Sequence, residues 1–150
     1  MKIPLIVRTY AEGKKPFATV SVKIPQSKTI YGRISPFVDT GSPWTVISKT
    51  DADRLRIVVS GTPRTVYLGG APILSYPLRN VTLKALCEDK KSVFNMSMPI
   101  VGVIQPIPNH DQSIRSAGST PSIIGADLLE RYRLALYFDI CNEISYLEKV

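Results

Sequence analysis

Residues 35–55 read SPFVDTGSPWTVISKTDADRL, and they place an acidic side chain in what otherwise looks like a core strand. Asp39 follows an apolar pair and is followed at once by Thr40 and Gly41. A lone buried carboxylate is costly unless it is hydrogen-bonded, paired or neutralised. Asp is also a poor strand residue and a good turn residue. The stretch therefore indicates either an Asx turn that ends a strand, with Gly41 in the turn, or a carboxylate kept for chemistry.

The composition is that of a folded domain. The chain has 150 residues, 44% of them hydrophobic and 21% charged, so we expect residues 1–150 to form one globular domain. Its two cysteines, Cys87 and Cys141, lack metal-ligand spacing and form no disulfide framework. The opening MKIPLIVRTY is too short an apolar run for a signal peptide or a membrane span. We therefore expect a cytoplasmic protein that does not associate with membranes.

The net charge of +7 raises the possibility of a nucleic-acid partner. The 19 basic residues, however, occur singly or in pairs such as Lys14-Lys15, with no run of five. Such scattering is typical of a solvated face, and we expect no specific nucleic-acid binding.

Most of the chain has the pattern of short strands joined by turns. Residues 17–24 alternate apolar and polar side chains, and residues 29–39 follow after turn material, which predicts a hairpin. Residues 64–76 predict a second hairpin around Gly69-Gly70. Further strands are expected at three places: 80–88, 94–104, and a final hairpin within 134–150 that turns at Asn142.

Helix signals are few. Residues 48–56 carry capping side chains before one or two turns, and residues 125–133 place Leu128, Leu129 and Tyr132 on one side of a short helix. Residues 105–121 are polar and without periodicity, which predicts a long loop that is either functional or mobile. His110, in that loop, has no His or Cys partner nearby and is expected to be a surface residue.

Three segments together resemble one family. FVDTGSPWTVI around Asp39 resembles the active-site loop of the retropepsin-like aspartic proteases, of the single-domain, non-viral or cellular type. SIIGADLLERYRLALYFD (122–139) is similar to the family's second element, and VYLGGAPILSYPL (66–78) lies where the family has its flap. The resemblance covers roughly residues 17–139. It implies a mainly β acid protease fold: a closed, barrel-like single lobe with a flap hairpin and one short C-terminal helix.

The resemblance also implies a mechanism. Peptide hydrolysis in this family uses two carboxylates that share one proton around a water molecule. This chain has one Asp-Thr-Gly motif, so the second carboxylate would come from another copy in a two-fold homodimer. Asp39 is the expected catalytic residue, acting on a peptide or protein substrate. No metal or organic cofactor is required.

Other site residues follow from the same resemblance. Thr40 would bond across to the partner's loop, Gly41 would let backbone N–H groups approach the carboxylate, and the hydroxyl of Ser42 would hydrogen-bond the carboxylate and shift activity toward acid pH. The expected flap and pocket residues are Leu68, Gly69, Gly70 and Ala71 at the flap tip, and Trp44, Ile123 and Ile124 in the pocket.

The sequence departs from viral members at Ser42-Pro43, in the flap, where Pro72 stiffens one arm, and in the long 105–121 segment. These departures leave a second interpretation open. The chain is then a non-catalytic or weakly active peptide-binding or scaffolding module with the same fold.

Overall fold

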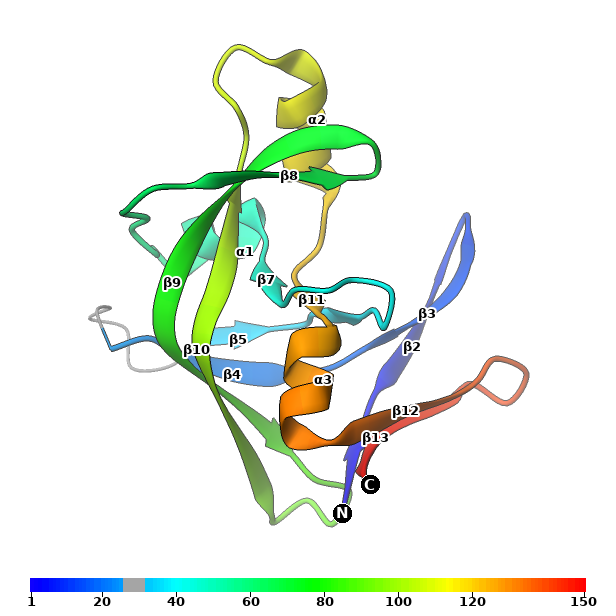
Figure 1. Cartoon of the computed structure of the whole chain (residues 1–150). Coiled ribbons are helices and arrows are strands. Elements are labelled where there is room, and N and C mark those ends of the chain that lie inside the picture. The colour runs from blue at the N-terminus through cyan, green and yellow to red at the C-terminus, as the bar shows by residue number, and fades with distance from the viewer. Residues whose placement is uncertain (26–31) are drawn as a thin grey trace.

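The computed structural model describes residues 1–25 and 32–150, and most of its regular structure is β-strand (Figure 1). The strands are β1 (Lys2–Pro4), β2 (Ile6–Tyr10), β3 (Gly13–Phe17), β4 (Val20–Lys23), β5 (Gly32–Ile34), β6 (Phe37–Val38), β7 (Val46–Ile47), β8 (Arg64–Leu68), β9 (Ala71–Leu86), β10 (Val93–Gln105), β11 (Ile123–Ile124), β12 (Leu134–Asp139) and β13 (Ile144–Lys149). The helices are α1 (Lys49–Arg54), α2 (Asp111–Ser119) and α3 (Ala126–Tyr132).

The larger sheet brings distant parts of the chain together around Asp39. Its strands follow the order β2-β3-β6-β11-β7-β10-β9-β4-β5, with β8 paired to β9. Within it, β11 pairs in parallel with β6 and antiparallel with β7. Residues 37–38, 46–47 and 123–124 therefore lie side by side. A smaller sheet, in the order β1-β13-β12, joins the two ends of the chain.

Two hydrophobic clusters fill the fold. The larger lies beneath the curled sheet and includes Val38, Ile47 and Ile124. The smaller consists of Val46, Ile73, Ile104, Ala117 and Ile123, with Val66 and Leu68 packed against it. It therefore joins the arms of the β8–β9 hairpin to helix α2, which lies above that hairpin (Figure 1).

Most of the expected hairpins and two expected helices are confirmed. β4 pairs antiparallel with β5, β8 with β9, and β12 with β13. Ser48 caps α1 by accepting a hydrogen bond from the Asp51 N–H, and α3 ends at Arg133 in the left-handed region. Residues 26–31, which include part of the predicted 29–39 strand, lie outside the described residues.

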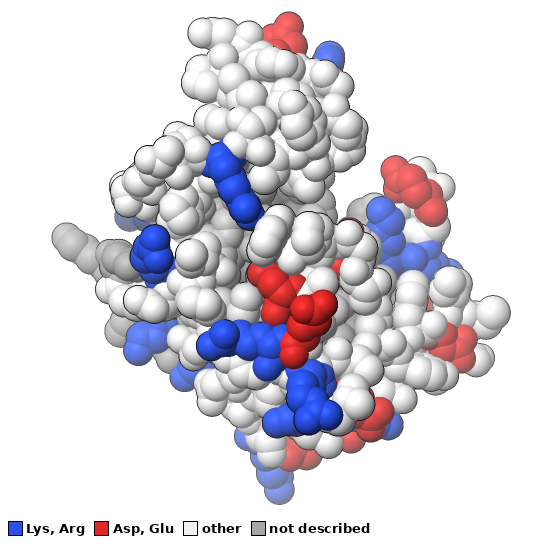
Figure 2. Space-filling model, viewed as in Figure 1, with Lys and Arg blue, Asp and Glu red and all other residues white. Residues whose placement is uncertain are grey.

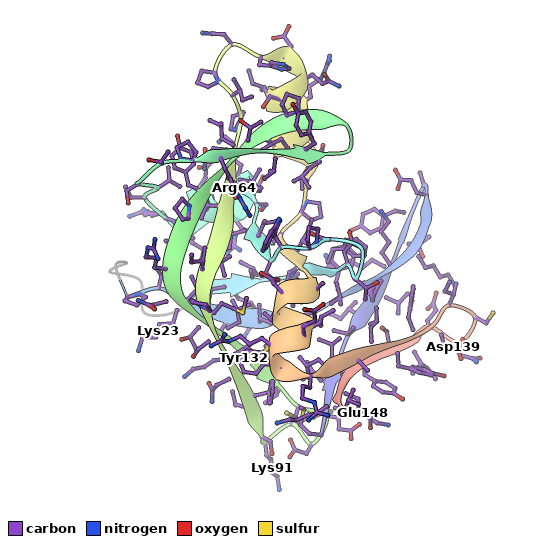
Figure 3. All side chains as sticks on the ribbon, in the orientation of Figure 1. Lys23, Arg64, Lys91, Tyr132, Asp139 and Glu148 are labelled. Atoms are coloured by element: carbon purple, nitrogen blue, oxygen red, sulfur yellow. The ribbon has the colours of Figure 1, made fainter. Side chains whose placement is uncertain are left out.

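The final hairpin turns near Asn142, as expected. The side-chain amide and the backbone N–H of Asn142 both donate to the Asp139 carboxylate, and these bonds lower the pKa of Asp139 below its usual value. Asp139 lies at the outer end of β12 (Figure 3). The hydrogen bonds from Asn142 thus favour the ionised form of the Asp139 carboxylate and stabilise the turn.

Three expectations are wrong. Residues 105–121 are not one long loop, because residues 111–119 form α2, with the imidazole of His110 accepting from the Ser113 N–H as its cap. Residues 80–88 are not a separate strand, since β9 runs unbroken from Ala71 to Leu86. Residues 32–39 are broken at Ser35-Pro36, where the chain passes from β5 to β6.

No helix among residues 1–25 and 32–150 has the length and apolar character needed to cross a lipid bilayer.

The shared core of the β8–β9 hairpin and α2 gives a first prediction. Ile73→Ala should lower the free energy of unfolding by about 2–5 kcal/mol, because it leaves a cavity in the smaller cluster. Val58→Ala, at a side chain that is 84% exposed, is the matched control and should change it by less than about 0.5 kcal/mol. Urea unfolding measures both. If both variants change the free energy of unfolding by the same small amount, α2 and the β8–β9 hairpin do not share a packed core.

Candidate active site

The loop that joins β6 to β7 holds the carboxylate of Asp39 by backbone contacts. The Asp39 N–H donates to the Ile124 carbonyl at 3.0 Å, which ties the loop to β11. The Gly41 N–H donates to Asp39 Oδ1 at 2.9 Å, and the Ser42 N–H donates to the Asp39 carbonyl at 3.2 Å. The expected approach of a backbone N–H to this carboxylate is therefore present. A Cβ on Gly41 would stand 3.3 Å from Asp39 Oδ1, so the loop is tight there.

Asp39 lies above an apolar floor. Val38, Ile47 and Ile124, on three neighbouring strands, are all buried, whereas the side chain of Asp39 is only half-buried. Thr40 and Gly41 are exposed at the loop surface. The carboxylate thus lies on an apolar floor and remains partly accessible to solvent.

The N-terminus of α3 braces this loop from behind. The first N–H groups of a helix have no partner within the helix. Here the Ala126 N–H donates to the Ser42 carbonyl at 2.8 Å, and the Asp127 N–H donates to the Pro43 carbonyl at 3.3 Å. The helix and the loop therefore satisfy each other's unpaired backbone groups.

A buried hydroxyl completes the brace. Thr45 Oγ1 donates to Asp127 Oδ1 at 2.7 Å and accepts from the Gly125 N–H at 3.1 Å. Asp127 Oδ1 also accepts from the Leu128 N–H at 2.8 Å. Sequence reasoning missed Thr45 and Asp127 as partners, because Thr45 reads as an ordinary strand residue and 80 or so residues separate the two.

Ser42 acts differently from the expectation. Its hydroxyl donates to the Trp44 carbonyl at 2.9 Å and so stabilises the loop. The expected hydrogen bond to the Asp39 carboxylate is not the one formed, because the backbone turn directs the hydroxyl toward Trp44. The hydrogen bond that was expected to shift activity toward acid pH is therefore not formed.

The β8–β9 hairpin lies over this loop as the expected flap does (Figure 1). Gly69 and Gly70 have φ of 60° and 80°, the left-handed pair that a two-residue hairpin turn requires. Leu68 is half-buried and Ala71 is buried at the base of the turn. Ser116 Oγ of α2 donates to the Leu68 carbonyl at 3.3 Å, so α2 contacts the flap arm by a polar bond as well as by packing.

A cleft of about 790 Å³ lies between β8 and residues 42–46 of the loop. Figure 2 shows a hollow below the part of the molecule formed by the β8–β9 hairpin and α2. Its walls are mainly apolar, with Val66 and Leu68 from β8, and Met98 and Ile100 from β10.

The Arg64 guanidinium lies 4.5 Å from the centre of the Trp44 ring. This contact joins β8 to the loop between β6 and β7 across the cleft. Figure 3 shows Arg64 on the flap side. A cation–π contact of this kind contributes about 0.5–1 kcal/mol at an exposed site, and neither partner was paired by the sequence reasoning.

The expected pocket residues have two different fates. Trp44 lines the cleft and is 46% exposed. Ile123 and Ile124 instead lie one in each core, since successive side chains of β11 point to opposite faces of the sheet. They support the loop from below and do not line the cleft.

The close approach at Gly125 generates a prediction. A Cβ there would lie 2.5 Å from the Trp44 carbonyl carbon and oxygen. Gly125→Ala should therefore lower the free energy of unfolding by about 2 kcal/mol or more, through a clash in a packed region. Gly118→Ala is the matched control, because a Cβ at that helical glycine meets nothing within 4 Å, and should raise stability by about 0.5–1 kcal/mol. Thermal and urea unfolding measure the change in the free energy of unfolding, which should be negative for Gly125→Ala and positive for Gly118→Ala. No change in Gly125→Ala would show that α3 does not pack closely against the loop.

The buried hydroxyl of Thr45 gives another prediction. Thr45→Val keeps the shape but leaves the Gly125 N–H and one bond to Asp127 unsatisfied, which should cost about 1–3 kcal/mol. Thr62→Val, at an exposed threonine of the same cleft, is the control and should be nearly neutral. Hydrogen exchange at the Gly125 amide should accelerate in the first variant alone. Unchanged protection at that amide would show that Thr45 does not hold it.

No protein-family model matches the sequence. No curated protein matches it either.

Solved structures do match. The chain is similar to a retropepsin-like aspartic protease from Rickettsia conorii, at 18% identity and a TM-score of 0.54, over 99% of this chain and 91% of that one. It is also similar to the retroviral protease-like domain of Ddi1 from Leishmania major, at 20% identity and a TM-score of 0.47, over 87% of this chain and 92% of that one. The first likeness shows the architecture, in agreement with the resemblance carried by residues 17–139. The chain has the fold of the retropepsin-like aspartic proteases.

Proposed function

We propose that this chain is an aspartic endopeptidase that acts as a homodimer, with one Asp39 from each copy in a shared catalytic pair. The observation that carries the proposal is the Asp39 loop itself. A half-buried carboxylate is held by the Gly41 N–H at 2.9 Å over a buried floor. The residues that follow it in the loop, 42–46, line a cleft whose opposite wall includes β8 of the glycine-tipped hairpin. The chain is also similar in fold to a solved retropepsin-like aspartic protease.

In aspartic proteases the two carboxylates lie about 3 Å apart. At that distance the two Asp39 carboxylates of the dimer cannot both ionise easily, so they share one proton. The ionised Asp39 takes a proton from a water molecule as the water oxygen attacks the peptide carbonyl carbon, and the protonated Asp39 of the other copy gives its proton to the carbonyl oxygen. The first Asp39 then passes the proton from water to the amide nitrogen, and the C–N bond breaks. The other Asp39 takes back a proton from a hydroxyl of the tetrahedral species, which leaves a carboxylic acid and an amine. Both steps need one protonated and one ionised carboxylate, so we expect a bell-shaped pH profile.

The proposed dimer is supported by a group of loops and hairpins that extend from one side of the molecule. The flap, the Asp39 loop and the β2–β3 and β12–β13 hairpins all extend in the same direction (Figure 1). Lys14 and Glu143 form an ion pair at 2.9 Å between the two hairpins, which keeps their tips together.

The same hairpins expose apolar side chains and a strand edge. The exposed apolar residues there are Ile6, Tyr10, Tyr137, Ile140 and Ile144. β12 is the edge of the smaller sheet, and an edge strand offers unpaired backbone groups to another chain. An isologous contact of two copies through this side would cover both.

We propose that the substrate is an extended peptide lying between flap and floor, with apolar side chains in the cleft and backbone hydrogen bonds to the flap. The flap acts as a lid, and residues 1–150 act as one domain. Basic side chains are scattered over the face shown in Figure 2, which favours a peptide over a nucleic acid.

Peptide-library cleavage between pH 3 and 7 tests the proposal. Asp39→Asn should lower the rate by at least about a hundredfold, because it removes the general base, while leaving the sedimentation profile of the dimer unchanged. Asp53→Asn, at an exposed carboxylate of α1 that pairs with Lys49, is the matched control and should retain the wild-type rate.

Two outcomes would overturn the proposal. One is cleavage that survives in Asp39→Asn. The other is a stable wild-type dimer that binds peptides but cleaves none of them, which would assign the chain to the non-catalytic peptide-binding alternative.

A further inference from the structure

A second cavity, of about 560 Å³, lies away from the cleft. Ser35 precedes β6 and Ser122 precedes β11, and both residues line this cavity. Asp39 and Gly125 follow the same two parallel strands. The cavity is therefore at the opposite end of these strands from the candidate active site, and the proposed peptidase chemistry does not use it.

Three arginines from three separate elements converge on the cavity. Arg8 comes from β2, Arg33 from β5 and Arg54 from α1. Asp51 is the one acidic residue among those described in its lining. The lining thus carries three positive charges against one negative charge, a sharper imbalance than that of the chain as a whole, with 19 basic and 12 acidic residues.

The charge of Asp51 is already compensated within the fold. Its Oδ1 accepts from the Arg54 guanidinium at 3.0 Å, and its Oδ2 accepts from Ser122 Oγ at 2.6 Å. The same guanidinium of Arg54 donates to the Arg33 carbonyl at 2.6 Å. These bonds form a neutral polar floor, with the hydroxyls of Ser48 and Ser122 buried in it.

Arg8 and Arg33 are left without a carboxylate. Neither forms an ion pair with any residue in the described ranges 1–25 and 32–150. Arg8 lies over the Phe17 ring at 5.0 Å, which orients its guanidinium without neutralising it. Two like charges at the rim of one cavity repel each other, and a bound anion removes that cost.

The remaining lining suits an oxyanion. Ser35 and Thr50 contribute hydroxyl groups to the same walls, and planar guanidinium groups match the oxygen spacing of phosphate with paired N–H donors. We propose that this cavity is a binding site for a phosphate-type oxyanion, held by Arg8 and Arg33 above the Asp51–Arg54 floor. The ligand is either free phosphate or a phosphorylated side chain, which share this chemistry.

Titration with sodium phosphate tests the site, at constant ionic strength and followed by amide chemical shifts. Saturable shifts should appear at residues 33–35, 48–54 and 118–122. Arg33→Gln and, separately, Arg8→Gln should weaken binding by about tenfold or more, because each removes a charged hydrogen bond.

The matched control is Arg79→Gln, which removes the same charge from an exposed strand position outside the cavity, and it should bind as wild type does. Because a ligand that binds only the folded chain stabilises it, saturating phosphate should also raise the melting temperature by about 5 °C or more. That rise should vanish in the Arg8/Arg33 double variant.

A phosphoserine peptide distinguishes the two sources. Binding at least about tenfold tighter than phosphate assigns the site to a phosphorylated protein segment, and equal binding assigns it to the free anion. Asp39→Asn should bind phosphate unchanged, so failure of the proposed peptidase function leaves this result intact. Shifts that do not saturate, or an equal loss in Arg79→Gln, would overturn the site.

Discussion

The hydrogen bonds between the N-terminus of α3 and the Asp39 loop are the constraint on which the site depends. A helix start has spare N–H donors and a tight loop has spare carbonyls, and here each set satisfies the other. The Ala126 and Asp127 N–H groups reach the Ser42 and Pro43 carbonyls, with Thr45 linking Asp127 to the same loop. The contact is close enough to require glycine at 125. A carboxylate at residue 39 is thus positioned by residues more than 80 positions later.

The features that local sequence determines were predictable. Asp39-Thr40-Gly41 indicates a tight turn that ends a strand, because the acceptor, the hydroxyl and the glycine lie within three residues. Gly69-Gly70 indicates a two-residue hairpin, since few other pairs adopt two positive φ angles. The short helix at 126–132 follows from apolar side chains on one side. These patterns predicted a mainly β domain, and the order of the three segments along the chain carried the resemblance to the retropepsin-like aspartic proteases from which the fold was predicted.

Features that depend on distant partners were not predictable. α2 is polar and carries Gly118, so its own residues favour a loop; it is stabilised by Ala117 in the flap core and by the His110 cap. The Thr45–Asp127 bond and the Arg64–Trp44 contact join residues that no local pattern connects. The Ser42 hydroxyl could donate to the Asp39 carboxylate or to the Trp44 carbonyl, and the backbone path of the loop directs it to the Trp44 carbonyl. Tertiary packing decides each of these cases.

The central claim, that one site is built from two copies, is tested most directly by mixing wild-type chain with Asp39→Asn chain and allowing subunits to exchange. If both carboxylates of a pair are needed, only dimers of two wild-type chains are active, so activity should fall as the square of the wild-type fraction. An equal mixture should then retain about one quarter of the activity of the same total amount of wild type. A linear fall, to about one half at equal mixture, would mean that each chain works alone and would contradict the shared catalytic pair.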